Sequence, residues 1–246
     1  MRVKMSNPKA AVVIIGNEIL SGRTLDINTQ EIALRLTEIG VDLIETRTIA
    51  DDRQMIIKTI KEMSAKYDYV FTTGGIGPTH DDITSESIAA AFNVKYIRNE
   101  DIYNVLKNHY ESMGEQLNPA REKMAYIPEG AVLLHNDATA VPGFAIRNVF
   151  VMAGIPYIMK SMLQSALPML KHGKVVKTLV LEVIVGESKI AVQFENLQKQ
   201  YPDVEMGSYP FTRDGKHATS LVLRSTNYDL LDKSFAQLKE ILKTYL

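Results

Sequence analysis

The sequence contains no cysteine among its 246 residues. That absence excludes disulfide bonds, thiolate metal sites and cysteine nucleophiles. A strong charge of either sign is also missing, because 28 lysines and arginines oppose 29 aspartates and glutamates, a formal net charge of −1. A chain balanced in this way has no basic footprint, so we expect no nucleic acid among its partners.

Long apolar runs are absent as well. The run AAVVII (residues 10–15) behind the basic N-terminus is short and has no cleavage site, and no run approaches the roughly 20 apolar residues that span a bilayer. We therefore expect no membrane contact and a cytoplasmic location. The histidines lack metal-ligand spacing and are expected at the surface or in packing; they are His80, His109, His135, His172 and His217.

The composition, 46% apolar and 23% charged, is that of a soluble globular protein with a core. Strand-like and helix-like segments alternate over the first 100 residues. Strands are predicted at 10–15, 41–50 and 68–73, each followed by a helix: one that begins with Asn28 as its cap and ends at Gly40, one along residues 55–63, and one over 83–92. This alternation predicts a doubly wound α/β fold with a mostly parallel sheet.

The rest of the chain is less regular at first. Helices are predicted at 99–114, at 118–124 behind the cap Asn118, and at 156–170, with strands at 131–134 and 149–153 around a loop, HNDATAVPGF. Residues 172–174 are the best domain boundary. The remainder predicts a small βαββα unit. We therefore expect two domains, residues 8–171 and 175–246.

The stretch FTTGGIGPTHDDIT (residues 71–84) follows the third strand, at the sheet edge where parallel α/β folds bind ligands. Gly74, Gly75 and Gly77 carry no side chains, so their backbone amides can converge on an anion such as a diphosphate. No lysine follows the last glycine, as a P-loop requires, and His80 stands where the dinucleotide fingerprint needs its third glycine. The stretch is therefore neither of these common nucleotide sites.

Two adjacent carboxylates, Asp81 and Asp82, follow the glycines. They admit two interpretations. One aspartate can cap the next helix while the other stays solvated, or the pair can hold a divalent cation together with substrate phosphates.

Other polar residues are expected at the same edge of the sheet. Asp51 and Asp52 follow the second strand, and Pro142 and the segment AGIP (153–156) come later, where turn formation alone explains the glycines and prolines. The remaining candidates follow the first strand or belong to the later loops; they are Asn17, Glu18, Asp26, Asn28, Asn136 and Gly143.

The motifs GNEILSG, TTGGIGPTHDDIT, NDATAVPGF and VMAGIPYIM, in this order, resemble the N-terminal region of the CinA family. That family belongs to the wider group of molybdopterin-binding domains, with MoaB, Mog and part of MoeA. The resemblance covers residues 8–170. The pattern VGESKIA…DVEMGSYP is similar to the small KH-like domain that follows in CinA proteins.

The resemblance implies a three-layer α/β fold and a metal-dependent hydrolase, using Mg²⁺, Mn²⁺ or Co²⁺, that cleaves the diphosphate of ADP-ribose or a similar nucleotide. Asp81 and Asp82 would be catalytic and bind the metal. The residues assigned to the phosphates or the rim are Gly74, Gly75, Gly77, Pro78, Thr79, Asn17, Glu18, Asp26, Asn28, Asn136 and Gly143. A homodimer is a further expectation of the resemblance.

The sequence also departs from the family pattern. DATAVPGF has one residue more before Pro-Gly than the usual form, Ala153 stands in a proline position, and the Gly-Asp after the second strand is Ala50–Asp51. The chain ends before the amidase domain that full-length CinA proteins carry, so that activity is expected to be absent. Two alternatives stay open: a molybdopterin-handling protein with molybdopterin as its ligand, and a nucleotide-binding regulator without catalysis.

Overall fold

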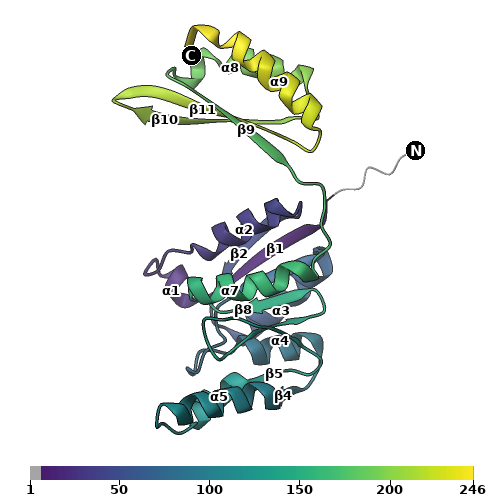
Figure 1. Cartoon of the computed structure of the whole chain (residues 1–246), viewed down its shortest axis with the longest axis vertical. Helices are drawn as coiled ribbons and strands as arrows, with labels where there is room; N and C mark the ends of the chain where they lie inside the picture. Colours follow the sequence, from purple (N-terminus) through teal and green to yellow (C-terminus); the bar gives the residue numbers. More distant parts are fainter. Residues whose placement is uncertain (1–6, 246) are drawn as a thin grey trace, which may run out of the picture. The chain divides into compact units, whose positions relative to one another are not determined.

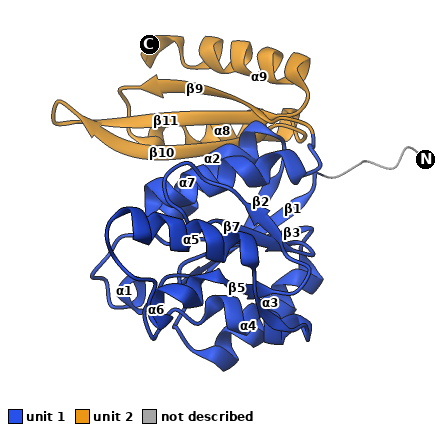
Figure 2. Cartoon of the chain, turned by 60° about the horizontal axis from the view of Figure 1, so that its bottom comes forward, with its two compact units in different colours: residues 1–173 blue, residues 174–246 orange. Residues whose placement is uncertain are grey.

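The computed structural model describes residues 7–245. The chain divides into two compact units, the first ending at Gly173 and the second beginning at Lys174 (Figure 2). The basic N-terminal start and Leu246, which the sequence places in the closing helix, lie outside the described residues. Over residues 7–245, every helix is too short or too polar to cross a membrane.

A six-stranded sheet in the order β2-β1-β3-β8-β7-β6 forms the centre of the first unit. The four strands β2, β1, β3 and β8 run parallel, and β7 pairs antiparallel with both β8 and β6. The predicted mostly parallel α/β sheet is thus confirmed. The strands are β1 (Lys9–Ile15), β2 (Asp42–Ile49), β3 (Tyr69–Thr73), β6 (Val132–Leu134), β7 (Gly143–Ile146) and β8 (Val149–Met152).

Helices cover both faces of this sheet. Alternate side chains of β1 enter opposite cores: Ala11, Val13 and Ile15 face one, and residues 10, 12 and 14 face the other. Full burial of each Val or Ile side chain contributes about 1.5–3 kcal/mol of stability. Because both faces of this strand are buried, every position favours an apolar residue, and the sequence of the strand is continuously apolar. The covering helices are α2 (Asn28–Glu38) and α7 (Pro156–Ala166) on one face, and α3 (Arg53–Lys66) and α4 (Thr84–Phe92) on the other.

A smaller layer lies beyond α4 (Figure 1). Its antiparallel pair, β4 (Tyr96–Arg98) and β5 (Tyr126–Pro128), did not appear in the sequence prediction because each strand has only three residues. Between these strands lie α5 (Glu100–Ser112), α6 (Pro119–Glu122) and the 3₁₀ turn η1 (Lys123–Ala125). Asn118 caps α6 as predicted, because its Oδ1 accepts from the Arg121 amide at 2.9 Å.

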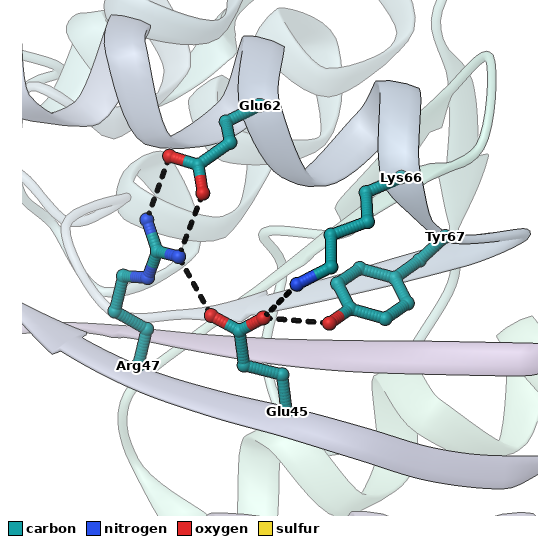
Figure 3. A network of polar contacts seen from close by, with 5 residues as sticks. All are labelled: Glu45, Arg47, Glu62, Lys66 and Tyr67. Carbon is teal, nitrogen blue, oxygen red and sulfur yellow. Dashed lines mark hydrogen bonds and ion pairs between the residues drawn. The ribbon is translucent and has the colours of Figure 1, made fainter.

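Polar contacts fix β2 against α3 at the edge of the sheet (Figure 3). Glu45 on β2 accepts from Arg47, from Lys66 Nζ at 2.8 Å and from the Tyr67 hydroxyl at 2.6 Å. Arg47 also donates to Glu62 on α3. The hydrogen bonds from Lys66, Tyr67 and Arg47 lower the pKa of Glu45 to about 2.

The second unit is a three-stranded antiparallel sheet, ordered β10-β11-β9, with two helices packed on one core. Its elements are β9 (Lys177–Val183), α8 (Ala191–Gln200), β10 (Glu205–Arg213), β11 (Lys216–Ser225) and α9 (Tyr228–Ile241). The predicted βαββα order is confirmed. The hairpin between β10 and β11 turns at Asp214 and Gly215, which both have positive φ (49° and 74°). An Asp-Gly pair is typical of such a tight two-residue turn. In Figure 1, α8 and α9 lie on the same side of this sheet.

Candidate functional site

A cavity of about 730 Å³ opens at the carboxyl ends of the parallel strands in the first unit. Ile15 ends β1, Gly74 follows β3, and Ala153 follows β8, and all three contribute to its wall. The full lining is Ile15, Glu18, Thr24, Asp51, residues 74–79, Asp81, Asp82, Leu106, His109, Tyr110, Met124, residues 139–141, residues 153–156, Ile158 and Met162. The cavity therefore lies where the sheet topology predicts a ligand site.

Glycine lets three strand ends approach each other closely at the base of the cavity. Gly74 has φ +102°, and a Cβ there would lie 2.1 Å from the Ile15 carbonyl oxygen. A Cβ on Gly154 would lie 3.4 Å from the Gly74 Cα. Gly74 is thus required by the packing of β1 against β3, whatever the cavity binds.

The residues that follow Gly74 in this loop (residues 74–79, called the glycine loop below) offer backbone donors. Among the described residues, the amides of Gly75, Ile76 and Gly77 donate to no protein acceptor, whereas the Gly74 amide donates to Met152 O at 3.1 Å. All three residues line the cavity. Consecutive unpaired N–H groups on a glycine-rich loop are donors that an anion can satisfy.

The loop is folded around Asp82. Its Oδ2 accepts from the Thr79 amide at 2.8 Å and also from the Thr79 hydroxyl. A Cβ on Gly77 would lie 2.7 Å from the same oxygen, so any larger residue would displace this carboxylate. The polar contacts of Asp82 therefore shape the loop and leave its other oxygen, Oδ1, without a protein donor among the described residues.

Neither aspartate caps the following helix. The first helical residue of α4 is Thr84, its N-cap is Ile83, and no side chain caps it. The capping interpretation of the aspartate pair is therefore wrong. Asp81 is 58% exposed, and its pKa lies below the ordinary value, first because of hydrogen bonding with the Thr79 side chain and then because of its own amide. It is an ionised carboxylate at the cavity mouth.

Two further carboxylates line the cavity close to Asp81. Asp51 accepts from the Asn17 amide at 2.8 Å, and Glu18 folds over Gly16, where a Cβ would lie 2.6 Å from its Oε1. Burial raises the pKa of Asp51, and the nearby charges of Glu18 and Asp81 raise it further. Four carboxylates thus line the cavity, and no lysine or arginine is among its lining residues.

The donor set fits a divalent cation that also binds phosphate. Oxygen donors are the ligands that Mg²⁺ and Mn²⁺ prefer, and one or two carboxylates with substrate phosphates are the usual arrangement for Mg²⁺. Over residues 7–245, no three Asp, Glu or His side chains form a complete metal cluster. A cation at Asp81 and Asp82 would therefore take its remaining ligands from phosphate and water.

Several predicted site residues do not line the cavity but hold the segments that do. Asn28 was predicted to cap α2, but it is the first helical residue, and Asp26 Oδ1 accepts from the amides of Asn28 and Thr29 at 3.0 and 3.2 Å. That prediction is wrong because the helix already begins at Asn28, and the Asp26 carboxylate accepts from its first two amides. The buried Asn28 side chain instead donates to Gly154 O at 2.7 Å and so holds the wall segment 153–156.

Asn136 and Gly143 also lie outside the lining. Asn136 Oδ1 accepts from the amides of Ala138 and Thr139, and its Nδ2 donates to Val141 O at 2.7 Å. It shapes the segment 139–141, which does line the cavity. Gly143 was predicted in a loop, but it begins β7, with its Cβ position 2.5 Å from Val151 O, so strand packing requires it.

The predicted residues therefore separate into two groups. Those in the cavity wall are Gly74, Gly75, Gly77, Pro78, Thr79, Glu18, Asp81 and Asp82; those outside it are Asn17, Asp26, Asn28, Asn136 and Gly143.

An apolar and aromatic end, which the sequence prediction did not include, completes the cavity. It consists of Leu106, His109, Tyr110, Met124 and Val141. His109 and Tyr110 lie edge to face with centroids 5.3 Å apart, and the Arg121 guanidinium lies 3.9 Å from the Tyr110 centroid. These residues belong to α5, to η1 and, for Val141, to the loop before β7, all more than 20 positions beyond the glycine loop, so no local sequence signal joins them to it.

The cavity has the size and composition of a small-molecule site, with carboxylates and unpaired amides in one part of its lining and an apolar end. Comparison with known families agrees with this class. Residues 11–172 match the family model described as "Probable molybdopterin binding domain", and residues 176–246 match "FAD synthase, middle domain". Because the first match covers more than half of the chain, the chain belongs to the molybdopterin-binding domain family.

Individual relatives support the resemblance to CinA. A protein of Archaeoglobus fulgidus is 36% identical over 199 residues, which cover 81% of this chain and 84% of that protein. A "putative competence-damage inducible protein" of Caldicellulosiruptor saccharolyticus is 27% identical over 96% of this chain and 60% of its own length. The crystal structure of "the protein CinA with unknown function" from Thermoplasma acidophilum has 31% identity and a TM-score of 0.60, over 65% of this chain and 96% of that one.

Proposed function

We propose that the protein hydrolyses the diphosphate bond of a nucleotide such as ADP-ribose, with a divalent cation at Asp81 and Asp82. The observation that carries this proposal is the pairing, in one cavity, of three unpaired loop amides with a group of carboxylates. The amides suit phosphate oxygens. The carboxylates repel an anion unless a cation lies between them.

The residues of the chain would divide the work as follows. The amides of Gly75, Ile76 and Gly77 would bind one phosphate, while Asp82, held by Thr79, would keep the loop in shape. The apolar end at His109 and Tyr110 would take the base. A cavity of about 730 Å³ lies within the size range of small-molecule sites.

The hydrolysis consumes one water. Its oxygen joins one phosphorus, the bond from that phosphorus to the bridging oxygen breaks, and the bridging oxygen leaves with the other phosphate, while protons pass to solvent. A bound cation would supply charge neutralisation and polarise the phosphorus. The amides would stabilise charge on the phosphate oxygens as the bond breaks.

The test is release of AMP. The full chain is incubated with ADP-ribose or FAD, with Mg²⁺, Mn²⁺ or Co²⁺ and with none, and the nucleotide products are separated. We expect AMP with at least one cation and none without. No release with any cation would refute the hydrolase.

A second candidate is a molybdopterin-handling protein, which the family match favours. The same amides would bind its phosphate and the apolar end its ring system. Calorimetry with molybdopterin or its adenylated form would show saturable binding, and no heat of binding would refute this candidate. Thermal stabilisation by nucleotide without turnover would instead favour a regulator without catalysis.

A further inference from the structure

One lysine contacts the glycine loop from a distant part of the chain. Lys123 Nζ donates to the Thr79 carbonyl oxygen at 2.9 Å, across 44 positions of sequence. Thr79 also donates to Asp82 through its amide and hydroxyl and lines the cavity. The contact therefore brings a positive charge to the loop that carries the unpaired amides.

We propose that Lys123 binds the diphosphate of the ligand at this loop. It would take the place of the lysine that follows the last glycine in a P-loop and is missing here. This inference rests on the proposed function for its ligand, a phosphorylated nucleotide, and it adds a residue that loop motifs alone do not identify.

The charge balance of the site supports this role. The cavity lining contains Glu18, Asp51, Asp81 and Asp82 but no lysine or arginine. A single divalent cation offsets only half of that acidic charge before a diphosphate enters. Lys123 supplies a further positive charge within reach of the loop.

Lys123 is also available to an anion. Within residues 7–245, no carboxylate lies within ion-pair distance of its Nζ, whereas its neighbours Arg121 and Glu122 are paired with Glu115 and Arg98. A carbonyl oxygen is a neutral partner, and the carboxylate whose pKa the Lys123 charge lowers is Asp81 of the cavity lining, so the ammonium charge acts at the site itself. An ammonium has three donors, so a phosphate oxygen can be added without loss of the Thr79 contact.

The backbone that carries Lys123 is held in place before any ligand arrives. Asn118 caps α6, Arg98 pairs with Glu122 at 3.1 Å, and the Asn99 amide donates to Ala125 O at 2.8 Å. Positioning by such contacts reduces the entropy lost when the side chain binds its ligand. In hydrolysis, the same ammonium would stabilise negative charge on the bridging oxygen as it leaves.

The test is binding of inorganic diphosphate with Mg²⁺ to the full chain, measured by calorimetry. We expect Lys123→Met to weaken binding about tenfold or more, since hydrogen bonds to charged groups contribute about 1.5–3 kcal/mol. Lys123→Arg should stay within about threefold of the wild type. Lys107→Met is the control, because it removes the same charge from an exposed α5 lysine that pairs with Glu111.

A purely structural role for Lys123 gives a different pattern. If the lysine only holds the loop, arginine and methionine variants lose diphosphate binding and thermal stability together, and the salt dependence of binding is unchanged. Unaltered binding in Lys123→Met, or no diphosphate binding by the wild type, would also overturn the proposal. Lysine-dependent diphosphate binding without AMP release would keep this inference and refute the hydrolase.

Discussion

Asp82 accepts hydrogen bonds from both the amide and the hydroxyl of Thr79, three residues before it. This relationship closes the turn that follows the glycines and fixes one carboxylate of the aspartate pair. Its neighbour Asp81 stays exposed and ionised. One aspartate thus maintains the loop, and the other lines the cavity as an exposed carboxylate.

Replacing Gly75 should destabilise the protein by more than the strain of its positive φ alone. Gly75 has φ +69°, and a Cβ there would lie 2.1 Å from the Oγ1 of the buried Thr84. Gly114 has nearly the same angle, φ +73°, with open space around it. The two sites therefore separate backbone strain from steric overlap.

We expect Gly114→Ala to lower the free energy of unfolding by about 1 kcal/mol, the cost of a left-handed alanine. Gly75→Ala should cost roughly 1–3 kcal/mol more because of the overlap with Thr84. Urea denaturation of both variants measures the difference. Equal losses would contradict the packing described for the loop.

Much of the fold follows from sequence pattern. The run AAVVII predicts a strand buried on both faces, and alternate residues of β1 do enter the two cores. The three-residue strands β4 and β5 escape prediction because they are too short for a periodic signal.

The site is predicted less completely. The loop motif identifies Gly75, Gly77 and Asp81 because they are adjacent in sequence. Tyr110 lines the cavity and Lys123 contacts Thr79 only through tertiary packing, so nothing in the local sequence marks them. Asn28 was misassigned because the helix begins one residue earlier than predicted and Asp26 accepts from its first two amides; the choice between two short polar side chains depends on backbone geometry.

Asn28 should be a positioning residue for the cavity wall. Its buried amide donates to Gly154 O, and an aspartate would place a carboxylate against that carbonyl. We expect Asn28→Asp to lower the free energy of unfolding by about 1–3 kcal/mol. Asn104→Asp is the control, because it makes the same change at an exposed position of α5. It should have little effect on the free energy of unfolding. If both variants unfold at the same urea concentration, the Gly154 contact does not stabilise the fold.

The aromatic end should select ligands that carry a ring. Tyr110→Leu removes the ring that lines the cavity beneath Arg121. We expect about tenfold weaker binding of ADP-ribose, because stacking on an aromatic side chain contributes about 1–3 kcal/mol for each base. Binding of inorganic diphosphate should not change.

Tyr103→Leu is the control for this variant. It lies on the same helix under another arginine, Arg98, at 4.2 Å, but outside the cavity lining. Calorimetry with both ligands distinguishes the two tyrosines. Equal loss of ADP-ribose binding in both variants would show a general effect of α5 rather than a ring site.

The Glu45 contacts should make stability depend on pH in the acid range. The pKa of Glu45 falls from 4.5 to about 2 on folding. A lowered pKa in the folded state means that the stabilisation is fully present above pH 4.5 and is lost as the pH falls towards 2. We expect Glu45→Gln to flatten the stability curve in this window.

Urea midpoints measured from pH 7 to pH 2 test this expectation. Glu240→Gln, on an exposed residue of α9, is the control and should follow the wild type. A Glu45→Gln curve as steep as that of the wild type would assign the acid sensitivity to other carboxylates.

The most direct test of the account is AMP release from ADP-ribose by the double variant Asp81→Asn/Asp82→Asn, compared with the wild type at the cation that the wild type prefers. Circular dichroism first establishes that both proteins are folded. We expect the variant to lose at least about a hundredfold in rate, in the range for loss of a group that stabilises the transition state. Full activity in the folded double variant would contradict the assignment of the cation to these two aspartates.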